Sequence, residues 1–259
     1  MILYKYYGFE SGIKALETGK VGFRVPLFFN DPFEVSTILS RDGDTQINTV
    51  LANTAVLSLT RTPLNSLMWA HYGHEHKGFV IGYDVDDEFF HCKETNLIPV
   101  RKGNMIYTRT KPVLSLTKSV VDDLCLCIDG LDEAKPNVLD LINHLFLNKD
   151  TIWSYEEEVR VVKKLSSWAM DHQEFYKNPY NQYTSLSEDI APGFSRQLMK
   201  GLNIYSHQPK ISEVYLGVRN KLDETMLNRL NSSKANGAEI YTVSVDKETW
   251  NLVSKKYMN

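Results

Sequence analysis

Cysteine is scarce in this sequence, and its scarcity excludes several classes of protein. Only Cys92, Cys125 and Cys127 occur among the 259 residues. Three cysteines do not make the disulfide framework of a small secreted protein, and an odd count fits a reducing compartment. No Cys-x-x-Cys pair occurs, so the common tetrahedral zinc fingers are excluded. We therefore expect Cys125 and Cys127 to pack as small apolar side chains.

Long apolar runs and an excess of basic residues are also missing. No window approaches the ~20 apolar residues that cross a bilayer, and the opening MILYKYY lacks the parts of a signal peptide. We therefore expect a cytoplasmic protein without membrane contact. Lys and Arg number 29 against 32 Asp and Glu, and the net charge of −3 excludes a globally basic nucleic-acid binder. The glycine-rich phosphate-binding motifs of P-loop and dinucleotide-binding proteins are absent as well.

What remains is a globular composition, with 42% apolar and 24% charged residues. No repeat or flexible linker divides the chain, which predicts a single domain over residues 1–259. Apolar residues at helical spacing over about 113–149 indicate two helices, broken near Gly130 and Pro136. Elsewhere β-branched and aromatic runs predict strands, and the whole predicts an α+β fold with an inserted helical segment and a C-terminal strand–helix–strand unit. The predicted strands are Ile2–Tyr7, Val21–Val25, Val56–Thr60, Gly78–Asp84, Ile98–Val100, Met105–Tyr107, Glu156–Lys163, Ile211–Val218 and Ile240–Val245, and the other helices are Ser11–Leu16, Asn65–Tyr72, Phe194–Gly201 and Asp223–Ala235.

Lys5 is the first candidate functional residue. Strand alternation places it on the face opposite Tyr4 and Tyr6. A lysine on a core strand needs a charged partner or a ligand, whereas on an edge strand it is simply exposed. The sequence leaves both readings open.

The segment Asn30-Asp31-Pro32-Phe33-Glu34 is typical of a turn, since short polar side chains cap their own backbone and proline restricts φ. We assign that structural role to Asp31 and Pro32. Asn30 and Glu34 remain available to face a pocket.

Histidines and aromatic residues gather between Met68 and Gly78. His71, His74 and His76 invite a metal site, but their spacing matches no closed site. Trp69 and Tyr72 are three residues apart, on one face of the predicted helix. They form either core packing or a stacking surface for a flat ring.

Charged residues cluster at Glu156, Glu158 and Arg160. On a strand, these three side chains share one face. The cluster is either a solvated face or a site in which a carboxylate binds a ribose hydroxyl while the arginine keeps that carboxylate ionised.

Taken together, these motifs resemble the bacterial domain-of-unknown-function family 2971, and the match extends from about Leu3 to Val218. The resemblance implies no activity. In chain order the motifs are Tyr4-Lys5-Tyr6, Phe29-Asn30-Asp31-Pro32-Phe33-Glu34, Ser58-Leu59-Thr60, Met68-Trp69-Ala70-His71-Tyr72 with Lys77-Gly78, Trp153-x-Tyr155-Glu156-x-Glu158-x-Arg160, and Val214-Tyr215-Leu216-Gly217.

A second resemblance is to mono-ADP-ribosyltransferases, which hold NAD in a split antiparallel β-core. Lys5, Ser58 and Glu158 stand in the order of that family's motifs, although the family usually has Arg or His where this chain has Lys5. The resemblance implies NAD as substrate, no metal, and the biological setting of a toxin or antiphage effector. It leaves the acceptor open among protein, nucleic acid, small molecule and water.

This second resemblance also implies roles for individual residues. Glu158 would stabilise the oxocarbenium-like state as nicotinamide leaves, Glu156 would orient or deprotonate the acceptor, and Arg160 would support both. The residues implied to bind NAD are Lys5, Tyr6, Asn30, Ser58, Thr60, Trp69, His71 and Tyr72.

Two alternatives stay open. One is a metal-dependent nuclease or hydrolase. The other is a non-enzymatic module that binds a nucleotide or a protein partner in a pocket of Trp69, Tyr72 and Glu158. The divalent ions of the first alternative would be held by Asp31, Glu34, His71, Glu156 and Glu158.

Overall fold

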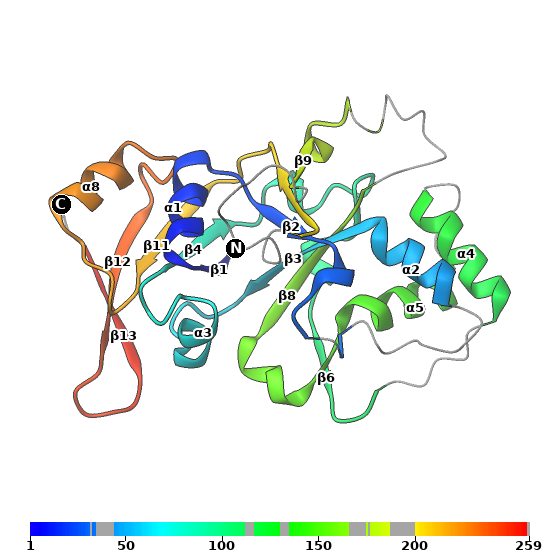
Figure 1. Cartoon of the computed structure of the whole chain (residues 1–259), viewed down its shortest axis with the longest axis horizontal. Coiled ribbons are helices and arrows are strands. Elements are labelled where there is room, and N and C mark those ends of the chain that lie inside the picture. Colours follow the sequence, from blue (N-terminus) through cyan, green and yellow to red (C-terminus); the bar gives the residue numbers. More distant parts are fainter. Residues whose placement is uncertain are drawn as a thin grey trace.

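The computed structural model describes residues 1–31, 33–34, 44–111, 117–129, 135–165, 175, 177–186 and 200–257. Its helices and strands form the α+β class that the sequence predicts (Figure 1). The helices are α1 (Phe9–Thr18), α2 (Asp44–Ala52), α3 (Ser66–His71), α4 (Lys118–Asp129), α5 (Pro136–Leu147) and α8 (Glu224–Asn231), with short 3-10 turns η1 (Pro26–Phe28), η3 (Glu88–Phe90), η4 (Val100–Lys102), η5 (Thr151–Glu156) and η6 (Pro179–Asn181).

The strands within this part of the chain pair mostly antiparallel. Eleven of them join in one large sheet, and β6 and β7 form a separate pair. The strands are β1 (Ile2–Tyr7), β2 (Gly22–Arg24), β3 (Thr54–Thr60), β4 (Phe79–Asp84), β5 (Asn96–Ile98), β6 (Ile106–Thr108), β7 (Asn148–Asp150), β8 (Glu158–Lys164), β9 (Tyr183–Leu186), β10 (Leu202–Tyr205), β11 (Ile211–Leu216), β12 (Glu239–Val245) and β13 (Leu252–Lys256).

Strand β3 is where the large sheet branches. Strand β8 pairs along one whole edge of β3. The other edge is shared, because β1 pairs with it at Thr60 and β2 pairs with it at Val56. Beyond this point β1 continues into β4, β11, β12 and β13, whereas β2 continues into β10 and β9. The two branches therefore separate beside Ser58, which is the half-buried position of a strand that is otherwise buried.

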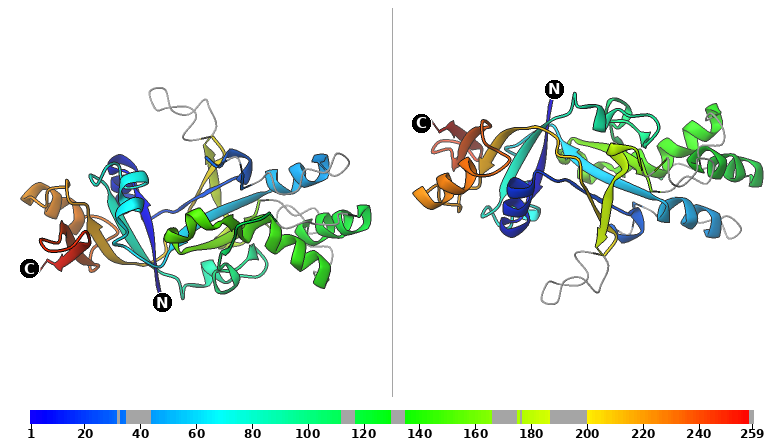
Figure 2. Two further views of the ribbon diagram at one scale, coloured as in Figure 1. Left: turned by 90° about the horizontal axis from the view of Figure 1, so that it is seen from below. Right: turned by 90° about the horizontal axis from the view of Figure 1, so that it is seen from above.

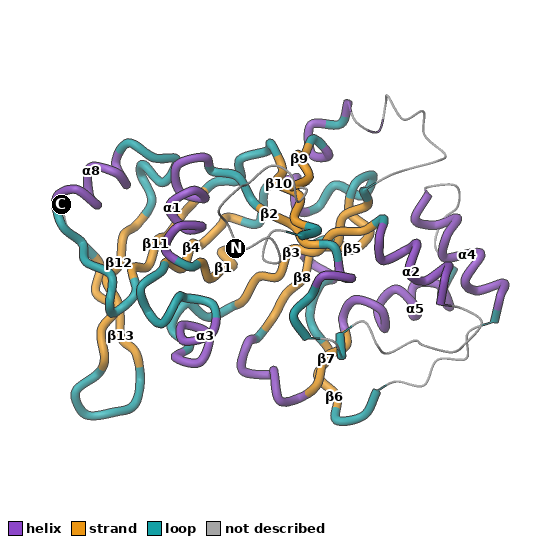
Figure 3. Tube along the Cα trace, viewed as in Figure 1, coloured by secondary structure: helices purple, strands orange, loops and turns teal. Residues whose placement is uncertain are grey.

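Two apolar layers cover the opposite faces of β3. Leu57 and Leu59 pack with α1 and α8, whereas Val56 packs with α2, α4 and α5. This alternation follows from the two-residue period of a strand, and burial on both faces makes β3 a central element. The helices α1 and α8 lie toward one end of the molecule, where β12 and β13 also lie, and α2, α4 and α5 lie toward the other end (Figures 2 and 3).

The local signals at helix ends are placed as the sequence indicates. Gly19 ends α1 in the left-handed conformation with φ of 67°. Asn65 and Asp223 cap the first turns of α3 and α8 by accepting hydrogen bonds from backbone amides. Strands β11 and β12 are parallel and flank α8 in the chain, which confirms the predicted strand–helix–strand unit. Among the described residues, no helix is long and apolar enough to cross a membrane.

Some elements differ from the prediction. The helix α2 and the strands β7, β9, β10 and β13 were not predicted, because short polar segments acquire their structure from their neighbours. Strand β8 begins at Glu158 rather than Glu156. The predicted helix Phe194–Gly201 lies almost wholly outside the described residues, as does the predicted break near Gly130.

Lys163 is a buried cation in the core. Its ammonium lies 4.2 Å from the ring centroid of Phe89 and donates hydrogen bonds to the Phe89 carbonyl and to the Thr95 hydroxyl. Burial lowers the pKa of Lys163 to about 7. In the unfolded chain this pKa returns to its ordinary value of 10.5, so the unfolded state binds more protons between pH 7 and pH 10.5.

Stability should therefore rise with pH across this range. In the wild type, Lys163 should raise the free energy of unfolding by about 2 kcal/mol between pH 7 and pH 9, and we expect Lys163→Met to lack this increase. Urea unfolding at both pH values measures the effect, with Lys255→Met on the exposed strand β13 as the control. A Lys163→Met variant that keeps the pH slope of the wild type would contradict the assignment.

Candidate functional site

The charged segment at the start of β8 is a turn followed by a strand. Asp150 caps η5 by accepting a hydrogen bond from the Ile152 amide, and Glu156 ends that turn. Glu157 then adopts the left-handed conformation, with φ of 44°, before β8 begins. The prediction that Glu156 and Glu158 share one strand face is therefore wrong, because Glu156 lies in a 3-10 turn. The two carboxylates are nevertheless brought to one place by a third residue.

That third residue is Lys149 on β7. Its ammonium lies 2.6 Å from an oxygen of Glu156, 2.9 Å from Glu158 and 3.3 Å from Glu34. The side chain of Lys149 is only 6% exposed, so these contacts are made away from water. Strand β6 pairs with β7 and places the Tyr107 hydroxyl where it accepts a hydrogen bond from the Glu158 amide. The short β6–β7 pair thus fixes the cation against η5 and β8.

Arg160 completes the arrangement from within β8. Its Nε lies 2.7 Å from Oε1 of Glu158, and Nη2 lies 3.2 Å from Oε2, so the guanidinium holds this carboxylate in two places. The Nη2 group also donates to Glu34, which stands 126 residues away in the sequence. We name these five side chains the charge cluster, which consists of Glu34, Lys149, Glu156, Glu158 and Arg160.

The two cations keep Glu158 ionised. Burial alone would raise the pKa of its carboxyl, but Arg160 and then Lys149 lower this pKa well below its ordinary value of 4.5. The charge of Glu158 therefore stabilises the folded protein fully above pH 4.5, and this stabilisation is lost as the pH falls below 4.5. A carboxylate that stays charged at neutral pH can stabilise a nearby positive charge but is poorly suited to donating a proton.

Tyr72 binds the second carboxylate from α3. Its hydroxyl donates a hydrogen bond of 2.7 Å to Oε1 of Glu156. Burial first, and then the charge of Glu156, raise the pKa of Tyr72. Tyr72 is therefore a neutral hydrogen-bond donor at physiological pH.

The point where the sheet branches lies beside this cluster. The side chain of Ser58 helps to lower the pKa of the Glu158 carboxyl, and Lys5 donates from its ammonium to the Ser58 carbonyl at 3.3 Å. Burial lowers the pKa of Lys5 to about 8, with Glu158 opposing the shift and Arg24 adding to it. We name this place the fork and define it by Lys5, Arg24 and Ser58, which are all half-buried. Three of the predicted residues, Lys5, Ser58 and Glu158, therefore meet here.

Other residues that were predicted to bind NAD are buried in the protein core instead. Trp69 is 0% exposed, with its indole donating to the Pro63 carbonyl, so it is a core residue and cannot stack on a substrate. Tyr6 packs edge-on against Trp69, on the strand face opposite Lys5. Thr60 is buried and donates to the Glu156 carbonyl, which holds the end of η5.

The remaining predicted residues lie at the surface. Asn30 and His71 are exposed, in the turn before Glu34 and at the end of α3. Asp31 accepts a hydrogen bond from the Phe33 amide, which confirms its predicted role in the turn, and Pro32 lies outside the described residues. Sequence reasoning did not select Lys149 at all. Its only local signal is a single cation in a polar segment after a helix, which is common on protein surfaces.

The arrangement does not favour the metal-dependent alternative. Within the described ranges, no three His, Cys, Asp or Glu side chains are placed to hold a metal ion. The three carboxylates that come close together, Glu34, Glu156 and Glu158, surround the ammonium of Lys149. Lys149 thus occupies the position that a cation would need.

Part of the chain is similar to a known family model. Residues 68–161 match the family model described as "Protein of unknown function (DUF2971)", which confirms the predicted resemblance to family 2971 over this part of the chain. The matched segment contains Tyr72, Lys149, Glu156, Glu158 and Arg160. The searches of curated proteins and of solved structures found no match.

Proposed function

We propose that this protein is an NAD-consuming enzyme of the ADP-ribosyltransferase type, with NAD bound at the fork. One observation carries the proposal. Lys5, Ser58 and Glu158 come from separate parts of the chain, yet they meet where the sheet branches: Lys5 donates to the Ser58 carbonyl, and the Ser58 side chain helps to lower the pKa of Glu158. An ionised carboxylate, a hydroxyl and a cation brought to one place suit a substrate with a ribose and a diphosphate.

Glu158 supplies the electrostatic part of the reaction. The glycosidic C–N bond of NAD breaks, its electron pair leaves with nicotinamide, and positive charge develops on the ribose. An acceptor or water then forms the new bond to C1′ and loses a proton. A carboxylate already held by Arg160 and Lys149 stabilises the positive charge without rearranging.

The other members of the cluster position this carboxylate and the acceptor. Glu156 is held through one oxygen by Tyr72 and through the other by Lys149, so its direction is fixed. In the proposal, Glu156 orients the acceptor or accepts its proton. Lys5 and Arg24 at the fork bind the diphosphate.

Calorimetric titration with NAD, combined with a nicotinamide-release assay, tests the proposal. We expect saturable binding and release of nicotinamide, both unaffected by a chelator. Absence of heat at millimolar NAD would overturn the proposal. Binding without nicotinamide release would instead favour the non-enzymatic binding module, and dependence on a divalent ion would favour the hydrolase.

The pKa of Lys5 predicts how NAD binding depends on pH. Lys5 is charged below about pH 8 and neutral above it, so its attraction to a diphosphate is lost as the pH rises. We expect NAD affinity to weaken about tenfold between pH 7 and pH 9, since a charged contact of this kind is worth about 1.4 kcal/mol.

Lys5→Arg provides the control for this pH dependence. A guanidinium stays charged across the range, so the variant should bind NAD with nearly constant affinity. If Lys5→Arg loses affinity with pH as steeply as the wild type, Lys5 is not the group that binds the phosphates.

A further inference from the structure

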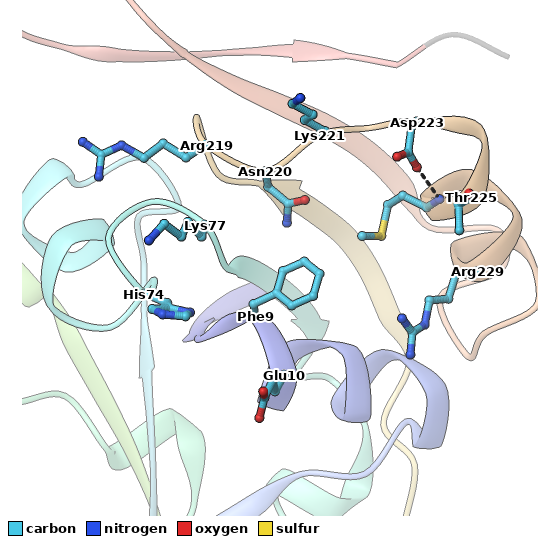
Figure 4. A pocket seen from close by; sticks show the side chains of 11 residues that line it. Phe9, Glu10, His74, Lys77, Arg219, Asn220, Lys221, Asp223, Thr225 and Arg229 are labelled. Atoms are coloured by element: carbon cyan, nitrogen blue, oxygen red, sulfur yellow. Dashed lines mark hydrogen bonds between the residues drawn. The ribbon is translucent and has the colours of Figure 1, made fainter.

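A second concave site lies away from the charge cluster, between the first turn of α1 and the start of α8 (Figure 4). It is an open depression with a volume of about 600 Å³, which is in the range of small-molecule sites. Among the described residues that line it, none belongs to the site predicted from the sequence. We name it the groove, and its lining residues include Phe9, His74, Lys77, Arg219 and Asp223.

Positive charge dominates the groove. Four of its lining side chains are Lys or Arg, whereas Glu10 and Asp223 are its acids. Lys77 and Arg219 lie on the same side of Phe9, together with His74, and Asp223 lies on the other side (Figure 4). Lys221 and Arg229 lie on the side of Asp223, so cations border the groove on both sides of the Phe9 ring.

The side of the groove that carries Lys77 and Arg219 is formed by two loops, and backbone hydrogen bonds join these loops to each other. The backbone amide of Arg219 donates to the His76 carbonyl at 2.9 Å, and the Gly217 amide donates to the Gly78 carbonyl at 3.2 Å. Gly217 allows this approach, because a Cβ there would lie 2.3 Å from the His76 carbonyl oxygen. The cations Lys77 and Arg219 are therefore carried on a fixed frame.

The first of these loops has an unusual backbone. His74, Glu75 and His76 have positive φ values of 49°, 54° and 66° in succession. The left-handed region is unfavourable for side-chain-bearing residues, and such conformations persist only where the surroundings enforce them. Here the strained turn presents Lys77 and His74 to the groove.

A carboxylate of the protein itself, that of Glu75, already lies near both cations. Glu75 is 3.2 Å from the ammonium of Lys77 and 4.0 Å from the guanidinium of Arg219. Its side chain is 67% exposed, so it can turn into solvent. A phosphate brings more charge and more acceptor oxygens than a carboxylate, so it can replace Glu75 between the same two cations.

The ring of Phe9 provides the second recognition element. It packs on Phe79 with ring centroids 5.6 Å apart and remains half-buried at the centre of the groove. A flat base can stack on this ring while its phosphates reach Lys77 and Arg219. A carboxylate on the opposite side, such as Asp223, suits the hydroxyls of a ribose.

We propose that this groove binds a nucleoside di- or triphosphate, with the phosphates between Lys77 and Arg219 and the base on Phe9. The site is separate from the fork, so this proposal stands independently of whether the protein consumes NAD.

Calorimetric titration with ATP tests the proposal. We expect saturable one-to-one binding that weakens at least about fivefold in Lys77→Ala and in Arg219→Ala, consistent with the loss of a charged contact. Glu75→Gln should tighten binding, because it removes the competing carboxylate. Lys247→Ala, which removes an equal charge from the exposed turn after β12, should bind ATP like the wild type.

Two further titrations can overturn the proposal. Tripolyphosphate binding as tightly as ATP would mean that the groove recognises phosphate alone, without a base. Loss of ATP binding in Lys5→Met but not in Lys77→Ala would place the nucleotide at the fork instead. Absence of ATP binding at millimolar concentration would also overturn it, while leaving NAD cleavage at the fork untouched.

Discussion

Lys149→Met is expected to lower the free energy of unfolding by about 3–5 kcal/mol, the usual cost of removing one partner from a buried ion pair. The ammonium contacts three carboxylates, Glu34, Glu156 and Glu158, and its side chain is 6% exposed. Without it, three buried negative charges face Arg160 alone. Chemical unfolding monitored by circular dichroism measures the loss.

A surface lysine provides the matched control. Lys135 pairs with Asp123 at 2.9 Å, but its side chain is 53% exposed. Lys135→Met should therefore change stability by less than about 1 kcal/mol. The double variant Lys149→Met with Glu156→Gln should recover part of the lost stability, because it removes one uncompensated charge. A Lys149→Met variant as stable as Lys135→Met would show that the cluster contributes little.

The second large effect concerns catalysis. Glu158→Gln is expected to slow nicotinamide release from NAD by about 10²–10³-fold, the usual effect of removing one preorganised electrostatic group. The amide has nearly the same shape as the carboxylate but cannot compensate a positive charge on the ribose. The rate is measured at saturating NAD, so that a change in affinity does not enter the comparison.

Glu157 provides the control for this substitution. It is the neighbouring residue, but its side chain is exposed and outside the charge cluster, so Glu157→Gln should keep the wild-type rate. Because Glu158→Gln also disturbs Arg160 and Lys149, a gentler variant is needed. Ser58→Ala removes only the hydroxyl that helps to lower the pKa of Glu158 and should slow the reaction about tenfold while the ion pairs remain. Full activity in both Glu158→Gln and Ser58→Ala would overturn the assignment.

Local features of the sequence predicted many of the elements. The apolar residues of α1 and α5 recur at helical spacing, and both helices form. Gly19 and Asp223 mark a helix end and a helix start by chemistry that needs no distant partner. The alternation within β1 placed Lys5 opposite Tyr6, because side chains of a strand alternate whatever sheet they join.

The same local reasoning could not select the functional cluster. Trp69 and Lys5 both stood in promising motifs, yet Trp69 is buried in the core and Lys5 lies at the fork. A motif does not state which side chains face the interior and which face an opening. That difference depends on how β1 and β2 share one edge of β3.

By itself, then, the sequence determined the α+β class, most strand and helix positions and the residue types available for chemistry, because these depend on neighbours within a few positions. Tertiary structure alone decided that Lys149 stands among three carboxylates and that Arg160 reaches Glu34 across 126 residues. Such contacts have no local pattern, since they arise from the pairing of distant strands. The physical reason is that burial removes water, and each buried charge must then find its partner wherever the fold places one.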